Sequence, residues 1–170
     1  DKKFIARSFF FLLYQFLRYK YDKVDVVFIS HTTSAKEVDE DKFFKRVSSG
    51  GTMLSSAPEL AKEIIYKRYH PSAWNIYAFH GSDGDNWDND IEKCIHITEE
   101  LKKICQLYCF CEIDPVRDSD SDWQFPNASK MSKEYQYIVD ETFKTLFLTK
   151  PDDIWPAFEG IFTTERDYMI

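Results

Sequence analysis

Acidic and amide side chains crowd one short loop that follows an apolar run. The run is WNIYAF (74–79), and HGSDGDNWDND (80–90) comes directly after it. Asp83 and Asp85 carry the first carboxylates of this loop. Carboxylate oxygens are hard ligands that suit magnesium, manganese or calcium. The alternative is an Asx-rich turn that caps the next helix, which is the commoner use of such residues.

A calcium-binding EF-hand does not fit this loop. Counting from Asp83, Trp87 falls where an oxygen ligand is needed, and Asp88 falls where the sharp turn requires glycine. The carboxylates therefore need ligands from elsewhere in the chain to complete a cation site.

A second loop, SSGGTMLSS (48–56), offers neutral oxygens just ahead of a helical pattern. Its two glycines let the backbone approach a ligand, and Thr52 presents a hydroxyl at the helix start. Loops at the carboxyl ends of parallel strands meet at one edge of a sheet, so Thr52 and Asp83 form a hard-oxygen pair suited to Mg²⁺ or Mn²⁺. A plain turn with an N-cap remains an equal alternative, and the loop lacks the Gly-Lys-Ser/Thr of a Walker loop.

Zinc is a weaker alternative. The four cysteines lie close together in the sequence, and His96 lies among them, but no C-x-x-C knuckle is present. Apolar flanks favour core positions with reduced thiols. The cysteines are Cys94, Cys105, Cys109 and Cys111.

Apolar runs alternate with helical patterns along the chain. Near-continuous apolar runs are typical of strands that are covered on both faces. Strand and helix alternation predicts an α/β fold with a mostly parallel sheet and helices on both sides. The expected strands are 24–30, 74–80, 107–113 and 142–149, with a short edge strand and turn in 34–44. The expected helices are 4–20, buried between the sheet and another layer, 55–69, 89–105, 133–141 and 151–162.

The overall composition restricts the function. The 170 residues carry a net charge of -7, which argues against nucleic acid or an anionic membrane as partner. The longest apolar segment is too short to cross a bilayer, and no export signal precedes it. We expect one cytoplasmic domain covering 1–170, and the 17% aromatic share indicates a thick core and a contact surface.

Several segments resemble known families. GGT ahead of a helix and SDG after a buried strand match two parts of the metal-ion-dependent adhesion site of von Willebrand factor A-like domains. More narrowly, the chain resembles the YhbH-type sporulation protein family, also called the YeaH family. The segments that carry this resemblance are IARSFFFLLYQFLRYKY, VVFISHTTSAKEVDEDKFF, GGTMLSSAPELAKEII, WNIYAFHGSDGDNW and DDIWPAF, almost the whole chain.

The resemblance implies a three-layer von Willebrand A-like, Rossmann-like fold in a cytoplasmic bacterial protein linked to sporulation or stress adaptation. It implies a PrkA-type serine kinase or a SpoVR-type protein as partner. Thr52 would be the threonine ligand and Asp83 the aspartate ligand of the metal, while Asp85 matches the family block without an assigned ligand role. These three are the candidate metal-site residues, and we assign no catalytic residue.

The first part of the adhesion motif, Asp-x-Ser-x-Ser at the end of an opening strand, is absent from the sequence. We therefore expect an N-terminally truncated domain whose first central strand, between 24–30 and 74–80, is missing. Either another segment or chain fills the gap, or the two halves close together. Without the ligands of that strand, we expect weak or absent metal binding.

Three functions remain open. The leading hypothesis is a metal-dependent protein-interaction module, in which the metal takes a partner's Asp or Glu as its last ligand. The second is a metal-assisted phosphohydrolase that uses Asp83 and Asp85. It lacks a basic phosphate clamp, and we expect His31 and His80, at predicted strand ends, to be structural residues. The third is a metal-free scaffold.

Overall fold

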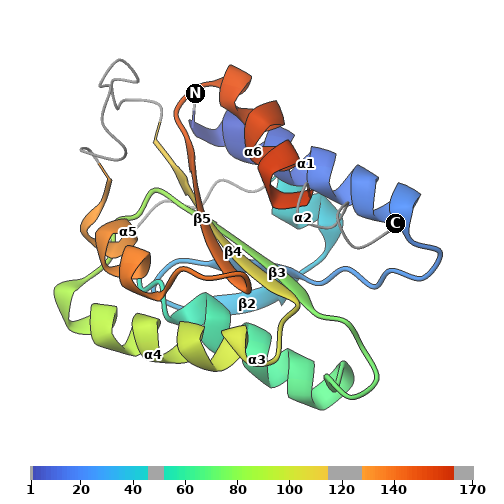
Figure 1. The fold of residues 1–170 in the computed structure, drawn as a ribbon, viewed down its shortest axis with the longest axis horizontal. Helices are drawn as coiled ribbons and strands as arrows, with labels where there is room; N and C mark the ends of the chain where they lie inside the picture. Colours follow the sequence, from blue (N-terminus) through green and yellow to red (C-terminus); the bar gives the residue numbers. More distant parts are fainter. Residues whose placement is uncertain (1, 46–51, 115–127, 163–170) are drawn as a thin grey trace.

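A parallel three-stranded sheet forms the centre of the molecule (Figure 1). The computed structural model describes residues 2–45, 52–114 and 128–162. The strands β3 (Tyr77–Ser82), β4 (Leu107–Ile113) and β5 (Phe143–Leu148) lie in the order β3-β4-β5. All seven residues of β4 are buried, because helices cover both faces of this apolar strand.

Helices lie on both sides of this sheet (Figure 1). One side carries α1 (Lys2–Lys20) and α6 (Ile154–Phe162), and the other carries α3 (Ser56–Arg68), α4 (Ile91–Lys102) and α5 (Lys130–Tyr135). The observed arrangement is therefore the predicted Rossmann-like mixture of helices on a parallel sheet. The remaining helices are α2 (Glu40–Lys45), η1 (Asp88–Asp90), η2 (Gln136–Ile138) and η3 (Pro151–Asp153).

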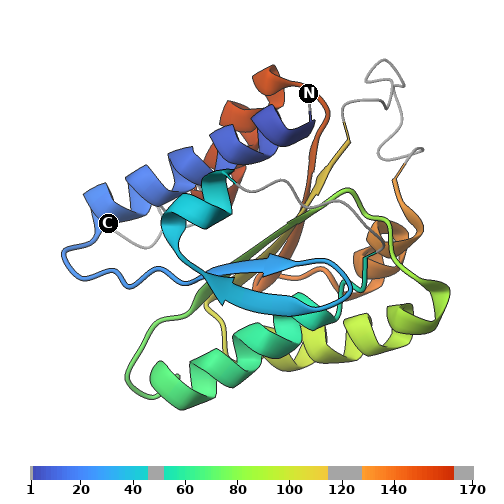
Figure 2. The same ribbon diagram turned by 180° about the vertical axis from the view of Figure 1, so that it is seen from behind.

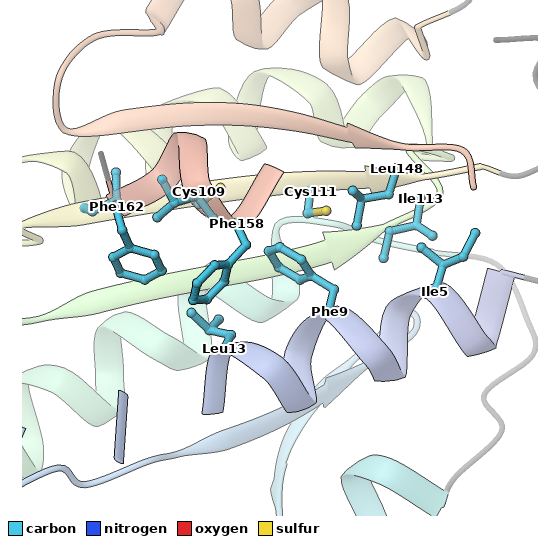
Figure 3. Close-up of a cluster of buried hydrophobic side chains, with 11 residues drawn as sticks. Ile5, Phe9, Leu13, Cys109, Cys111, Ile113, Leu148, Phe158 and Phe162 are labelled. Atoms are coloured by element: carbon cyan, nitrogen blue, oxygen red, sulfur yellow. The ribbon is translucent and has the colours of Figure 1, made fainter. Parts of the chain in front are cut away.

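The core has one cluster on each face of the sheet. On the first face, α1 points Ile5, Phe9 and Leu13 at β4 and at α6 (Figure 3). Cys109 and Cys111 of β4 contribute to this cluster because they lie two residues apart on a strand. The opposite cluster joins α3, α4 and α5 to the sheet through Leu54, Ile65, Cys94, Leu101, Cys105, Tyr108, Phe110, Met131, Tyr135 and Phe143.

A separate antiparallel hairpin lies beside the parallel sheet (Figure 2). It consists of β1 (Phe28–His31) and β2 (Ala35–Val38), and it packs against α3 on one side and α2 on the other. Within the described part of the chain, no strand pairing joins β1 to β3. One edge of β1 and one edge of β3 therefore have no partner strand among the described residues, and a gap lies between them.

This gap changes the burial of the strands beside it. The strands predicted at 24–30 and 74–80 were expected to be covered on both faces, but all of β1 and most of β3 are only partly buried. Both strands also begin later than predicted, at Phe28 and Tyr77. The apolar character of these runs predicted strands correctly, while their burial depends on a neighbour that the described residues do not supply.

Three further expectations need correction. The helix α1 was expected to be buried between the sheet and another layer, yet Phe4 and Phe11 are more than half exposed, because none of the described elements covers them fully. The turn expected after β2 is the helix α2, whose first turn is acidic and suits the helix dipole. The helix expected over 133–141 ends early, since Val139 is already extended. No helix in the described ranges is long and apolar enough to cross a membrane.

Candidate functional site

The candidate site lies at the carboxyl end of β3, where Asp83 directly follows the strand. Its Oδ1 accepts a hydrogen bond from the Asp85 amide at 3.2 Å, and its Oδ2 accepts one from Lys2 Nζ at 3.1 Å. The Asp83 side chain is 34% exposed. This carboxylate therefore already attracts a cation, the Lys2 ammonium, at a position that solvent reaches.

Gly84 follows and permits the tight path of the loop. Its φ of 81° lies in the left-handed region, which favours glycine. A Cβ at this position would come within 2.3 Å of Ser129 Oγ and 2.9 Å of Glu112 Oε2. The loop can pass so close to the end of β4 only because residue 84 has no side chain.

A buried carboxylate anchors the neighbouring strand end. Glu112 of β4 is 1% exposed, and its oxygens accept hydrogen bonds from the Ser129 amide at 3.1 Å and Ser129 Oγ at 2.7 Å. The Ser132 hydroxyl also donates to it. Ser129 in turn accepts from the Ser132 amide and caps α5. The sequence analysis missed this cluster, although a single charged residue inside the apolar run LYCFCEI was the available signal.

One part-buried and two buried hydrogen bonds join the Thr52 loop to the Asp83 loop. Asn86 Oδ1 accepts from the Leu54 amide at 3.1 Å. Asp90, which is 1% exposed, accepts from the Ser55 amide at 3.0 Å and from Ser55 Oγ at 2.5 Å. On its other side the Thr52 loop is held to β1, since the Met53 amide donates to the Thr32 carbonyl at 3.0 Å.

The acidic loop thus has two kinds of residue. The alternative for this loop was an Asx-rich turn that caps the next helix. Asp90 lies at the cap position of α4, but its side chain makes no cap bond there and accepts hydrogen bonds from Ser55 instead. Asn86 and Asp90 hold the two loops together by hydrogen bonds, and we call these two residues the clamp. By contrast, Asp83 is partly exposed and the Asp85 side chain is exposed. The clamp places the predicted residues Thr52 and Asp83 on two loops that touch each other.

These residues provide few metal ligands. Asp83 carries a carboxylate and Thr52 a hydroxyl, and both are oxygen ligands of the kind that Mg²⁺ accepts beside water. Groups of three or more His, Cys, Asp or Glu side chains able to hold a metal do not occur among the described residues. Binding through Thr52, Asp83 and Asp85 remains a prediction.

Two histidines meet across the gap between the sheets. His31 Nε2 of β1 lies 3.2 Å from His80 Nε2 of β3, and His80 Nδ1 lies 3.0 Å from the Tyr108 hydroxyl. Burial lowers the pKa of His80 well below its usual value, and the neighbouring His31 lowers it further. Burial also lowers the pKa of His31, while the charge of Asp83 acts in the opposite direction. At neutral pH the pair is uncharged and links the two sheets.

The sheet divides the four cysteines into two pairs. Cys94 and Cys105 lie on one face of the sheet, whereas Cys109 and Cys111 lie on the other. Burial raises the pKa of Cys109 to about 12, and that of Cys94 and Cys105 to about 12 as well. One zinc ion could not bind all four thiols in this arrangement, because the sheet separates the two pairs.

The fold defines the class of this protein. It is an α/β protein with a Rossmann-like parallel sheet, and its polar loops lie at the carboxyl ends of the strands. The chain belongs to the family described as "Protein of unknown function (DUF444)", whose model matches residues 1–165.

Curated bacterial relatives support this assignment. A UPF0229 protein of Ruminiclostridium cellulolyticum is 46% identical over 167 residues, which is 98% of this chain and 40% of the relative. A UPF0229 protein of Bacillus thuringiensis is 40% identical over 164 residues, which is 96% of this chain and 40% of the relative. The chain thus spans about two fifths of the length of these relatives. No solved structure matches the chain.

Proposed function

We propose that this chain is part of a metal-dependent protein-interaction module of the von Willebrand A type. The observation that carries the proposal is the buried clamp between the two loops, made by Asn86 and Asp90. It fixes the Thr52 loop beside the Asp83 loop while leaving Asp83 partly exposed. A cation held there by one carboxylate and one hydroxyl keeps positive charge, so it attracts an acidic residue of a partner.

The gap between β1 and β3 supports the finer fold assignment. An adhesion-type domain needs one more parallel strand between these two edges, and that strand would supply further oxygen ligands. The helix α1 begins at Lys2, beside Asp83, so a strand leading into α1 would end at the same edge of the sheet. We infer that such a strand, from the longer protein or from another chain, completes both the sheet and the site.

The biological setting is a proposal that rests on the sequence resemblance alone. It places the protein in the bacterial cytoplasm, in sporulation or stress adaptation. A PrkA-type serine kinase or a SpoVR-type protein would be the partner.

Magnesium and manganese titration tests the site. We expect isothermal calorimetry on residues 1–170 to show weak binding at most, and a full-length family member to bind at least about tenfold more tightly, because the additional strand adds oxygen ligands. In whichever protein binds, Asp83→Asn and Thr52→Ala should abolish binding. Lys2→Gln should strengthen binding, because the ammonium competes for the Asp83 oxygen.

Asp88→Asn is the matched control, since its side chain is 82% exposed on the same loop. Binding that survives Asp83→Asn, or that Asp88→Asn weakens equally, would contradict the site. Phosphoester turnover that needs both the metal and Asp83 would instead favour the phosphohydrolase alternative.

A further inference from the structure

A groove lies between α4 and α5, and Asp88 at the end of the acidic loop contributes to one end of it. It has a volume of about 550 Å³, and the two helices line it from the side of the molecule opposite α1 (Figure 1). Its lining residues are Asp88, Ile91, Glu92, Ile95, His96, Glu99, Lys130 and Glu134.

The groove has an apolar floor. Ile91 and Ile95 lie four residues apart, so they occupy the same face of α4. Both are only partly buried, and their inner sides pack against the core cluster of Tyr108, Phe110 and Tyr135. The core therefore holds Ile91 and Ile95 in place, while their outer sides remain accessible to a partner.

The rim of the groove is acidic. It carries four carboxylates and one ammonium, that of Lys130, which lies 2.7 Å from Asp88 Oδ1. The three remaining carboxylates, Glu92, Glu99 and Glu134, form no ion pair within the described ranges. Glu92 and Glu99 are two helical turns apart, roughly 10 Å along α4, and α5 contributes Glu134 to the same groove.

We propose that this groove binds a basic amphipathic helix of a partner protein. An apolar side chain of the partner covers Ile91 and Ile95, and its Lys or Arg side chains pair with Glu92, Glu99 and Glu134. Charge complementarity selects this occupant, because an acidic or neutral segment would leave three carboxylates unpaired beside a covered apolar floor. The inference is independent of any metal at Asp83.

The test uses a fluorescent Leu/Lys peptide, LKKLLKLLKKLLKL, and the 170-residue chain. We expect fluorescence anisotropy to show saturable binding, and amide chemical shifts to change mainly over residues 88–99 and 130–134. The counterpart with Glu in place of Lys should not bind. The triple variant Glu92→Gln, Glu99→Gln and Glu134→Gln should weaken binding at least about tenfold, because it removes the charges that pair with the peptide.

A charge-matched triple variant separates the groove from the net charge of -7. Asp22→Asn, Asp25→Asn and Glu141→Gln remove the same charge from exposed positions elsewhere and should change affinity less than twofold. Ile95→Ser should weaken binding without changing the charge. Equal weakening by both triple variants, shift changes outside the groove, or no binding of the Leu/Lys peptide would overturn the proposal.

Discussion

Single residues at the strand ends decide how closely the loops approach the sheet. Gly84 combines a positive φ with neighbours that leave no room for a methyl group, and Glu112 beside it accepts hydrogen bonds from Ser129 and Ser132. Because Glu112 is buried, the hydrogen bonds from Ser129 and Ser132 offset the cost of removing its side chain from water. The loop that carries Asp83 therefore packs against the buried polar cluster of Glu112, Ser129 and Ser132, which is not part of the adhesion-type metal motif.

Gly84→Ala is expected to destabilise the protein. A left-handed φ costs an L residue about 1 to 2 kcal/mol, and the clash with Ser129 adds a similar amount, so we expect a loss of roughly 2 to 4 kcal/mol in the free energy of unfolding. Urea denaturation followed by circular dichroism measures it. Gly160→Ala is the control, because open space surrounds that position within α6, and it should gain about 0.5 to 1 kcal/mol. Equal effects of the two variants would contradict the packing described for Gly84.

At the scale of elements, the clamp joins two helices as well as two loops. Asp90 lies directly before α4, and Ser55 lies directly before α3, so their hydrogen bonds fix the two helix starts relative to each other. Lys93 and Glu59, 2.9 Å apart, form an exposed ion pair between the same helices. The buried contact contributes more than the exposed one, because its polar groups have no water to replace a lost partner.

Asp90→Ala should therefore cost about 2 to 4 kcal/mol of unfolding free energy, since it leaves the Ser55 amide buried without an acceptor. Denaturant titration provides the value, and hydrogen exchange should show faster exchange at the start of α3. Asp88→Ala, on the exposed side of the same loop, should stay within about 0.5 kcal/mol of the original chain. If Asp90→Ala were equally mild, the clamp would not hold the loops together.

For the whole molecule, the contact between the two sheets contains two partly or fully buried histidines. The hairpin contacts β3 through His31 and His80. Ring contacts such as that between Phe28 and Phe43 pack the hairpin against α2. The pKa of each histidine is lowered in the folded state, so the unfolded chain binds protons that the folded chain does not. Stability from these groups is complete above about pH 6.5 and falls as the pH drops toward the folded pKa values.

We expect the free energy of unfolding, and with it the melting temperature, to fall between pH 7.5 and pH 5.5. The slope of the free energy is at most about 1.4 kcal/mol per pH unit for each histidine. His80→Gln should reduce this slope, measured by differential scanning calorimetry. Carboxylates with lowered pKa, such as Asp140 at about 2, lose their contribution only in more acidic solution, below about pH 4. His96→Gln should leave the slope unchanged, because that side chain is 74% exposed on α4. A slope that His80→Gln and His96→Gln reduce equally would contradict the role of the buried pair.

The sequence alone determined the α/β class and the position of most elements. The run LYCFCEI is a buried strand as predicted, and the helices over 4–20, 55–69 and 89–105 follow their apolar periodicity. These features depend on local patterning, which is written in consecutive residues.

Only the tertiary structure decided which polar residues work together. Asp90 and Ser55 are 35 positions apart, and Glu112 and Ser129 are 17 positions apart, so no spacing rule connects them. The same applies to the unpaired edges of β1 and β3, because strand pairing joins segments that are distant in the chain. Burial and hydrogen bonding over such separations follow from packing, which one-dimensional periodicity does not contain.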